Sequence, residues 1–282
     1  MSWLLPAVVA LLAALGIREP VLRRRIPRLE IDNYRGRRVL VGGGIVIAGA
    51  LAAAAIAAVA AGLAGSRRFV PDPGNRTLLG TLVLAFGFFG LGFLDDYAGD
   101  GRSKGFKGHL TALMRGEVTT GAVKAFGGMG LAFAVALWWN DLHLPAAVLD
   151  GLLIALAANF LNLLDLRPGR AAKVYLLLWI FVAAGAAGSA YLPAGAAVTA
   201  AALAWLPADL GERGTLGDSG ANLLGAVLGA GMVAGFGVAA TGAVLGVLVL
   251  LTLASERVSF TKLIDRTAPL RWLDGLGRSR TG

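Results

Sequence analysis

Long hydrophobic runs alternate with short polar segments along the whole chain. Nine runs stand out, at residues 2–17, 39–64, 78–94, 118–139, 146–164, 174–192, 195–206, 220–240 and 242–254. Roughly 20 helical residues cross the hydrocarbon core of a bilayer, because a helix rises ~1.5 Å per residue. Most of the runs are long enough, although 195–206 is short and only Thr241 and its neighbours separate the last two. The pattern predicts an all-α fold, a polytopic integral membrane helical bundle of about nine transmembrane helices.

Positive charge divides the polar segments into two groups. If the spans alternate in direction, one side of the membrane carries the segments 18–38, 95–117, 165–173, 207–219 and 255–282. All 26 lysines and arginines lie there, or one turn further on at Lys124, except Arg67, Arg68 and Arg76. Cytoplasmic loops carry such an excess of basic residues. We therefore predict an outside N-terminus, a cytoplasmic tail over 255–282, and a single transmembrane domain over 1–282 in the plasma membrane.

The composition supports a membrane protein and excludes several kinds of site. Apolar residues make up 57% of the chain, charged residues 15%, and the mean hydropathy is +0.72. Without cysteine, the chain has no disulfides or thiolate chemistry, and its two distant histidines exclude a multi-histidine metal site. The net charge of +9 follows from membrane topology, so we expect no nucleic-acid partner.

Glycines in the predicted spans favour close helix packing. The pairs Gly225/Gly229 and Gly231/Gly235 have the GxxxG spacing that lets membrane helices approach closely. The triplet 42–44 is also assigned to packing, because no Gly-Lys-Ser/Thr sequence follows it, as a phosphate-binding loop would require.

Four aspartates stand at the ends of predicted spans on the basic side of the membrane. Asp95 and Asp96 close the third span, Asp165 closes the fifth, and Asp218 opens the eighth. A carboxylate at a membrane edge is costly unless it is paired, coordinated or functional. Because the helix ends share one membrane level, we expect these carboxylates to converge on one site.

The convergent acids indicate phosphoryl-transfer chemistry. Asp95 and Asp96 lie about 100° apart on a helix, so one can act as a ligand and the other as a proton acceptor. Oxygen ligands of this kind suit Mg²⁺, which takes one or two carboxylates besides water or phosphate oxygens. Asp218 lies where helix N–H groups also favour phosphate. The basic residues expected to neutralise phosphate charge are Arg102, Lys104, Lys107, Arg167, Arg170 and Lys173.

Each of these residues also has a purely structural interpretation. Asp218 suits a helix N-cap, whereas the helix dipole disfavours the acids at 95 and 96 near a C-terminus. Asn159, Asn162 and Asp165 can hydrogen-bond between helices. The basic residues can serve only as topology determinants and headgroup contacts.

The ordered motifs resemble the polyprenyl-phosphate sugar-1-phosphate transferases. This superfamily includes phospho-N-acetylmuramoyl-pentapeptide transferase and the UDP-GlcNAc:undecaprenyl-phosphate GlcNAc-1-phosphate transferases. The likeness covers about residues 31–230 and is carried by NYRGRRVLVGGGIVI, FLDDYAG, NFLNLLD and LGDSGANLLG. The chain departs from the family where Leu166-Arg167-Pro168-Gly169 replaces Gly-Leu-Asp-Gly, and it lacks the family's histidine-rich loop.

The resemblance implies an Mg²⁺-dependent transfer of a sugar-1-phosphate from a UDP-sugar to undecaprenyl phosphate, with release of UMP, in cell-envelope polymer synthesis. It implies that Asp218 ligates the metal and that Asp95 or Asp96 positions or deprotonates the lipid phosphate. Asn162 and Asp165 would line the nucleotide side, and Lys107 matches a family lysine. The implied partners are a UDP-sugar, the polyprenyl phosphate and the lipid bilayer, and a homodimer is left open.

Two other functions compete with this hypothesis. A catalytically degenerate relative would bind polyprenyl phosphate, or assist envelope assembly, without turnover. A transporter fits less well, because the acids lie at one membrane edge and no inverted repeat of broken helices is visible.

Overall fold

The computed structural model describes residues 3–24, 26–65, 75–99 and 119–278. Its helices are α1 (Leu4–Arg23), α2 (Gly43–Leu63), α3 (Arg76–Ala98), α5 (Thr120–Trp139), α6 (Leu144–Leu164), α7 (Arg170–Gly185), α8 (Leu192–Leu210), α9 (Gly217–Gly235), α10 (Val238–Ser255), α11 (Phe260–Arg266) and α12 (Ala268–Gly275), with a short 3-10 helix at Pro27–Leu29. The same described ranges contain three short strands, β1 (Glu30–Asp32), β2 (Arg38–Val41) and β3 (Gly214–Thr215).

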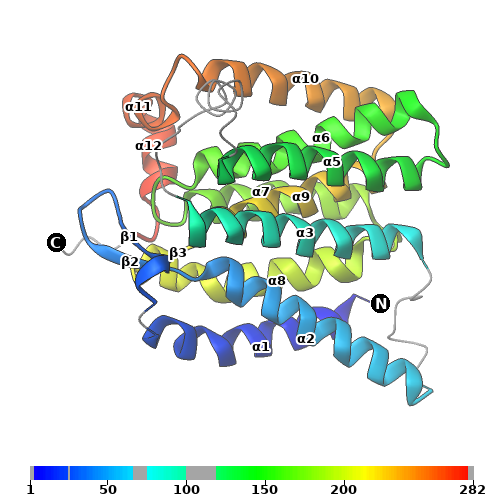
Figure 1. Cartoon of the computed structure of the whole chain (residues 1–282), viewed down its shortest axis with the longest axis horizontal. Coiled ribbons are helices and arrows are strands. Elements are labelled where there is room, and N and C mark those ends of the chain that lie inside the picture. Colours follow the sequence, from blue (N-terminus) through cyan, green and yellow to red (C-terminus); the bar gives the residue numbers. More distant parts are fainter. Residues whose placement is uncertain (1–2, 25, 66–74, 100–118, 279–282) are drawn as a thin grey trace.

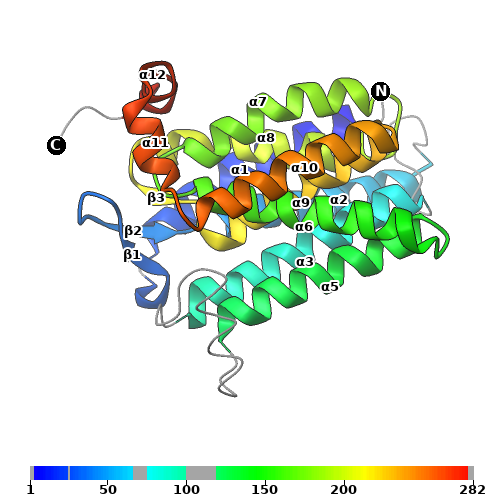
Figure 2. The same cartoon turned by 90° about the horizontal axis from the view of Figure 1, so that it is seen from above.

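The long helices run roughly side by side along one axis, as Figure 1 shows, and the view from above in Figure 2 agrees. Helix α9 lies in the middle, where it packs against α2, α3, α6 and α7. The strands, α11 and α12 gather at one end of the bundle, which we call the sheet end (Figure 1). A largely helical bundle confirms the predicted all-α class.

Within the part of the chain that the structure describes, six helices are long and apolar enough to cross a membrane, namely α1, α2, α3, α5, α6 and α10. They indicate a membrane protein, as predicted. Most of the nine predicted hydrophobic runs overlap a single helix, although 220–240 reaches from α9 into α10 and 174–192 reaches the first residue of α8. The three runs that do not correspond to these six helices lie mainly over α7, α8 and α9. Of these, α8 and α9 are rich in buried residues and form much of the core.

Several predicted helix ends are displaced, and local contacts explain the differences. Helix α1 continues past residue 17, because Arg18 donates to the Ala204 carbonyl (2.7 Å) and Glu19 pairs with Arg213 (2.6 Å). Helix α8 covers Leu192–Leu210, well beyond the predicted 195–206. The break after α9 falls at Phe236, whose backbone is extended, and not at Thr241.

A small sheet connects distant parts of the chain at the sheet end. Strand β1 pairs antiparallel with β2, with Ile31 opposite Val39, and β2 pairs parallel with β3, with Val41 opposite Thr215. This sheet was not predicted, because strands of two to four residues carry little periodicity. It fixes the segment after α1 beside the segment that leads into α9.

Glycines bring the helices together, as predicted. A Cβ added at Gly225 would lie 2.5 Å from the Cα of Ala158, and one at Gly229 would lie 2.8 Å from the Cα of Ile154. Gly43 has equally little space against the Trp205 indole and the Leu216 backbone. These contacts hold α6 and α2 directly against α9, which positions the first turn of α9.

Candidate functional site

Side chains from three helices meet at the sheet end, around the first turn of α9. Lys124 of α5 places its ammonium 2.6 Å from Oδ2 of Asp95 at the end of α3, and it also pairs with Asp218 of α9. Thr120 donates to the other oxygen of Asp95 (2.6 Å). All three charged side chains are at least two thirds buried. Two carboxylates and one cation are therefore held together away from bulk water.

The other two aspartates bind the backbone at the start of α9. Asp96 accepts hydrogen bonds from the N–H groups of Asp218 and Ser219, both at 2.9 Å. Asp165, directly after α6, accepts from the N–H of Gly217 at 3.0 Å. Both carboxylates satisfy free N–H groups of the helix and oppose its positive dipole end. The prediction that phosphate binds these N–H groups is therefore wrong, since protein carboxylates already occupy them.

Gly217 makes this convergence sterically feasible. Its φ of +70° is in the left-handed region that glycine favours, and a Cβ there would lie 2.9 Å from the Asp96 carboxylate. Gly92 of α3 has a similar role, because a Cβ at that position would lie 2.6 Å from the Cα of Ser219. Small residues on α3 and α9 thus allow the two helix ends to touch.

The carboxyl of Asp165 lies in a strongly acidic environment. Burial raises its pKa well above the usual range, and the negative charges of Asp209 and Asp218 raise the pKa further. The hydrogen bond from the Gly217 N–H acts in the opposite direction but does not offset these effects.

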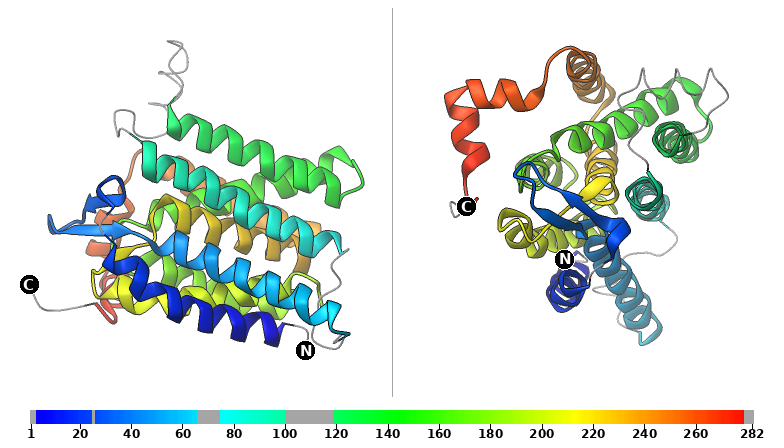
Figure 3. Two further views of the ribbon diagram at one scale, coloured as in Figure 1. Left: turned by 60° about the horizontal axis from the view of Figure 1, so that its bottom comes forward. Right: turned by 60° about the vertical axis from the view of Figure 1, so that its left-hand side comes forward.

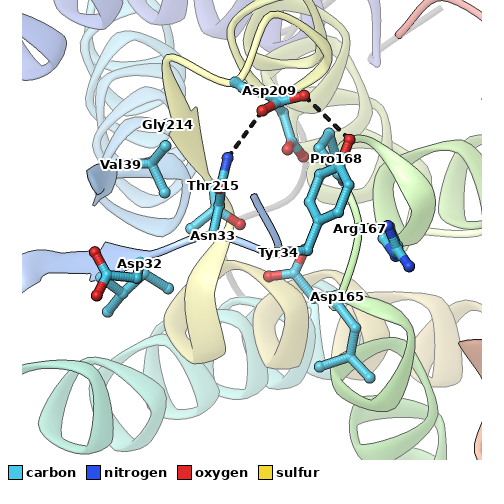
Figure 4. Close-up of a pocket in the computed structure, with 13 residues that line it drawn as sticks. Asp32, Asn33, Tyr34, Val39, Asp165, Arg167, Pro168, Asp209, Gly214 and Thr215 are labelled. Carbon is cyan, nitrogen blue, oxygen red and sulfur yellow. Dashed lines mark hydrogen bonds between the residues drawn. The ribbon is translucent and has the colours of Figure 1, made fainter. Parts of the chain in front are cut away.

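A cavity of about 310 Å³ opens beside Asp165 (Figure 4). Its walls come from the β1–β2 hairpin, the segment after α6 and the end of α8 with the following segment. The Arg167 guanidinium lies over the Tyr34 ring, 4.3 Å from its centroid. Glu212 accepts from the Asn33 amide (2.9 Å) and from the Tyr34 hydroxyl (3.2 Å). Asp209 also lines the cavity, and one of its buried carboxylate oxygens has no hydrogen-bond partner among the described residues.

Two basic residues that we expected to face phosphate are engaged elsewhere. Arg170 is 3% exposed and makes a bidentate pair with Asp274 of α12, at 2.8 and 3.0 Å. Lys173 donates to three backbone carbonyls near the end of α12, the shortest at 2.6 Å from that of Asp274. These contacts correct the prediction for Arg170 and Lys173, because both side chains bind α12. Among the described members of the predicted basic set, Arg167 lines the cavity.

The other predicted site residues, Asn162 and the basic residues of the segment after α3, have no described side-chain contact with this site. Asn162 lies one turn before Asp165, and its side chain makes no hydrogen bond within the described ranges. Lys107, Arg102 and Lys104 lie outside the described residues.

The sequence pattern predicts only a topological role for Lys124, as one of the basic residues on the cytoplasmic side, and not its place between Asp95 and Asp218. A single lysine one turn inside an apolar helix was the available signal. The sequence pattern also missed Tyr34 and Asp209, for which only the tertiary structure supplies a reason.

Two of the four aspartates, Asp95 and Asp218, are placed so that they could bind the same small divalent ion. Among the described residues no three His, Asp or Glu side chains are arranged to hold a metal. Asp95 and Asp218, however, both direct an oxygen at the position of the Lys124 ammonium. Two carboxylates are enough for Mg²⁺ when water and substrate phosphate complete its ligand shell.

Comparison with known proteins adds no family assignment. No protein-family model matches the chain, and no curated protein sequence matches it. Evidence for its function therefore comes from its own residues.

Proposed function

We propose that this protein is a membrane phosphotransferase that moves a sugar-1-phosphate from a UDP-sugar to undecaprenyl phosphate and releases UMP, in synthesis of a cell-envelope polymer such as peptidoglycan. The observation that carries the proposal is the meeting of Asp95, Lys124 and Asp218 from three helices. Asp165, which accepts from the N–H of the neighbouring Gly217, connects this group to the cavity that it lines. The ordered aspartate motifs of the sequence support the same reaction class.

The proposal includes a membrane arrangement. Nine helices cross the plasma membrane, the N-terminus lies outside, and the sheet end with the C-terminus faces the cytoplasm. The concentration of basic residues in the segments of that end supports this orientation. A lipid phosphate in the inner leaflet and a soluble UDP-sugar would then reach the same group of side chains.

In the reaction, a phosphate oxygen of the lipid forms a bond to the sugar-bearing phosphorus of the donor. The bond from that phosphorus to the bridging oxygen breaks, and UMP leaves with the electron pair. Catalysis of such a transfer depends mainly on positioning and on stabilisation of the developing negative charge. Lys124 provides a buried cation for this purpose, and Asp95, oriented by Thr120, is placed to accept a proton from a protonated lipid phosphate.

The cavity beside Asp165 is the proposed place for the nucleotide. The Tyr34 ring and the Arg167 guanidinium form a stacked pair at its wall, which suits a planar base and an anionic phosphate. Asp165 lines this cavity and accepts from the N–H of Gly217 at the start of α9, and Asn162 lies one turn before it in α6. The nucleotide would therefore extend from the cavity toward Lys124.

Asp95 and Asp218 are the residues that would hold Mg²⁺, which when bound supplies charge neutralisation at the phosphate oxygens. In that case the Lys124 ammonium would pair with the substrate phosphates in place of the two carboxylates.

The test is release of UMP by the detergent-purified protein with undecaprenyl phosphate, Mg²⁺ and a panel of UDP-sugars that includes UDP-GlcNAc and UDP-MurNAc-pentapeptide. We expect Asp218→Asn to reduce the rate by about 10²–10³-fold. Asp141→Asn is the matched control, because Asp141 is exposed and pairs with Arg76 in a different part of the fold. If no donor releases UMP, or if Asp218→Asn is as active as the unaltered protein, the proposal is wrong.

One observation favours a second candidate, a relative that binds polyprenyl phosphate without turnover. Lys124 fills the space between Asp95 and Asp218, and Asp96 and Asp165 already bind the backbone. This candidate predicts that radiolabelled undecaprenyl phosphate binds while UMP is not released, and that cells tolerate Asp95→Asn. A phenotype of Asp95→Asn equal to that of gene deletion would argue against it.

A further inference from the structure

Helices α11 and α12 lie across the direction of the bundle. In the right-hand view of Figure 3 the long helices are seen nearly end-on, while α11 and α12 run in the plane of the picture at the edge of the bundle. They follow α10, only 11% of which is buried and which exposes Val247, Leu250 and Leu253. The segment therefore leaves a helix that faces lipid and turns parallel to the membrane plane.

One side of α12 is apolar and uncovered. Leu270 and Leu273 lie three residues apart on neighbouring faces of α12. Trp272 lies about 100° from Leu273 on the side away from Leu270, and Leu276 directly follows the helix. All four are exposed, Trp272 to 66%. Leu263 of α11 is likewise exposed. Exposed leucines beside a tryptophan are typical of a helix at a membrane interface.

Contacts of Asp274, which lies on the side of the helix away from Trp272, hold α12 in this orientation. Asp274 is buried, and it binds Arg170 at two points and Arg278 at 2.5 Å. Lys173 caps the helix by donating to the carbonyls of Leu273 and Leu276. We call these contacts of Arg170, Lys173 and Arg278 with α12 the tail clamp. Because the clamp fixes the Asp274 side of α12 against α7, Trp272 and Leu273 face away from the bundle.

The charge of the segment identifies what covers the apolar side. Exposed basic residues accompany the apolar ones, at Arg257, Lys262, Arg266 and Arg271. Basic side chains near a membrane surface are attracted to anionic headgroups, while leucine and tryptophan enter the boundary with the acyl chains. Both kinds of residue are present on a segment that continues the lipid-facing α10.

We propose that α11 and α12 form an interfacial element that binds the headgroup region of a leaflet containing anionic lipid. The tail clamp sets its depth and orientation. Through Arg167, which contacts Asp265 of α11 at 3.7 Å and lines the cavity, the element also touches the wall of the candidate site. Membrane binding by α11 and α12 does not depend on catalysis and is independent of the proposed phosphotransferase function.

The experiment uses the natural absence of cysteine, which lets one introduced cysteine carry a nitroxide without background. The variants Trp272→Cys and Leu273→Cys test the element, Leu250→Cys marks a lipid-facing position on α10, and Arg38→Cys marks an exposed position on β2. The labelled full chains are reconstituted in vesicles of phosphatidylcholine with about one third phosphatidylglycerol. Collisions with oxygen and with a water-soluble nickel complex are then compared by electron paramagnetic resonance.

We expect labels at 272 and 273 to collide with oxygen several-fold more than with the nickel complex, at a depth between positions 250 and 38. Access to nickel equal to that of position 38 would overturn the proposal, since the segment would lie in water. Protection from both reagents, with broadening between labels of two molecules, would also overturn it, because a second copy of the chain would then cover the apolar side.

A variant without the basic side chains distinguishes electrostatic attraction to anionic lipid from insertion of the apolar side chains. In the combined variant Arg257→Gln, Lys262→Gln, Arg266→Gln and Arg271→Gln, the label at 273 should be shallower in the anionic vesicles and unchanged in pure phosphatidylcholine. An unchanged depth in both vesicle types would contradict a role for anionic lipid.

Discussion

At the scale of single residues, Lys124 determines the electrostatics of the candidate site. Asp95 and Asp218 would repel each other without the ammonium between them, and the three side chains are largely withdrawn from water. A buried charge whose partner is removed is strongly destabilising. The stability of the sheet end and the proposed chemistry therefore depend on the same side chain.

We predict that Lys124→Met lowers the free energy of unfolding by about 1.5–3 kcal/mol, the range for hydrogen bonds to charged groups. Asp95→Asn should lower it less, since the amide keeps an acceptor for Thr120. Because the two residues are in contact, the double variant should lose less than the sum of the single losses. Denaturation of the four proteins in detergent measures this, and additive losses would mean that Lys124 and Asp95 do not interact.

Asp96 differs from its neighbour because its oxygens bind the backbone of α9. We expect Asp96→Ala to cost about 1–2 kcal/mol, as for loss of a helix cap, since the N–H groups of Asp218 and Ser219 lose their acceptor. Thermal unfolding should show the loss. Asp32→Ala, at an exposed position of β1, should leave the midpoint unchanged. An equal shift in both variants would refute a capping role for Asp96.

At the scale of the elements, close contact between helices at glycines positions the site. Gly225 is packed against the backbone of α6, so Gly225→Ala must push α6 and α9 apart. We expect a loss of about 1–3 kcal/mol, as for overpacking in a core. Gly242→Ala in α10 is the matched control, because the added methyl has no neighbour within 4 Å outside its own helical backbone. Equal thermal midpoints for the two variants would contradict the packing argument.

The tail clamp is an ionic contact between elements and should depend on pH. Burial would raise the pKa of Asp274, but the hydrogen bonds and charges of Arg170 and Arg278 outweigh it and lower the pKa. A folded-state pKa below the unfolded value of about 3.9 means that the carboxylate stabilises docking above that pH. This stabilisation is lost as the pH falls through the folded-state pKa.

Amide hydrogen exchange of α12 measures that dependence. Exchange should accelerate as the pH falls below about 4, after correction for the intrinsic rate. In Asp274→Asn it should already be fast at neutral pH and show no such transition. Asp265→Asn serves as the control, because its contact with Arg167 is long and half exposed. A transition that persists in Asp274→Asn would assign it to another group.

At the scale of the whole molecule, the proposed orientation has a direct test. Leu142, in the connection between α5 and α6, and Arg38, at the sheet end, are both exposed. In intact cells we expect a membrane-impermeant maleimide to label Leu142→Cys and to spare Arg38→Cys. After permeabilisation both should react. Labelling of Arg38→Cys in intact cells would place the sheet end outside the cell. A UDP-sugar in the cytoplasm could then not reach the candidate site.

The sequence by itself determined the helical class, the membrane environment and the helix ends at which the four aspartates lie. It could do so because hydrophobic runs of membrane length and charges at their ends are local patterns. GxxxG spacing is also a local pattern, and it correctly predicted that Gly225 and Gly229 lie at a helix contact.

Only the tertiary structure decided what each polar side chain does there. The adjacent acids have different partners, since Asp95 pairs with Lys124 whereas Asp96 binds the backbone at the start of α9. Arg170 pairs with Asp274 of α12. The three-stranded sheet and the cavity beside Asp165 also came only from the fold. The physical reason is that these partners are separated by many residues along the chain, so helix packing and not local pattern brings their charges together.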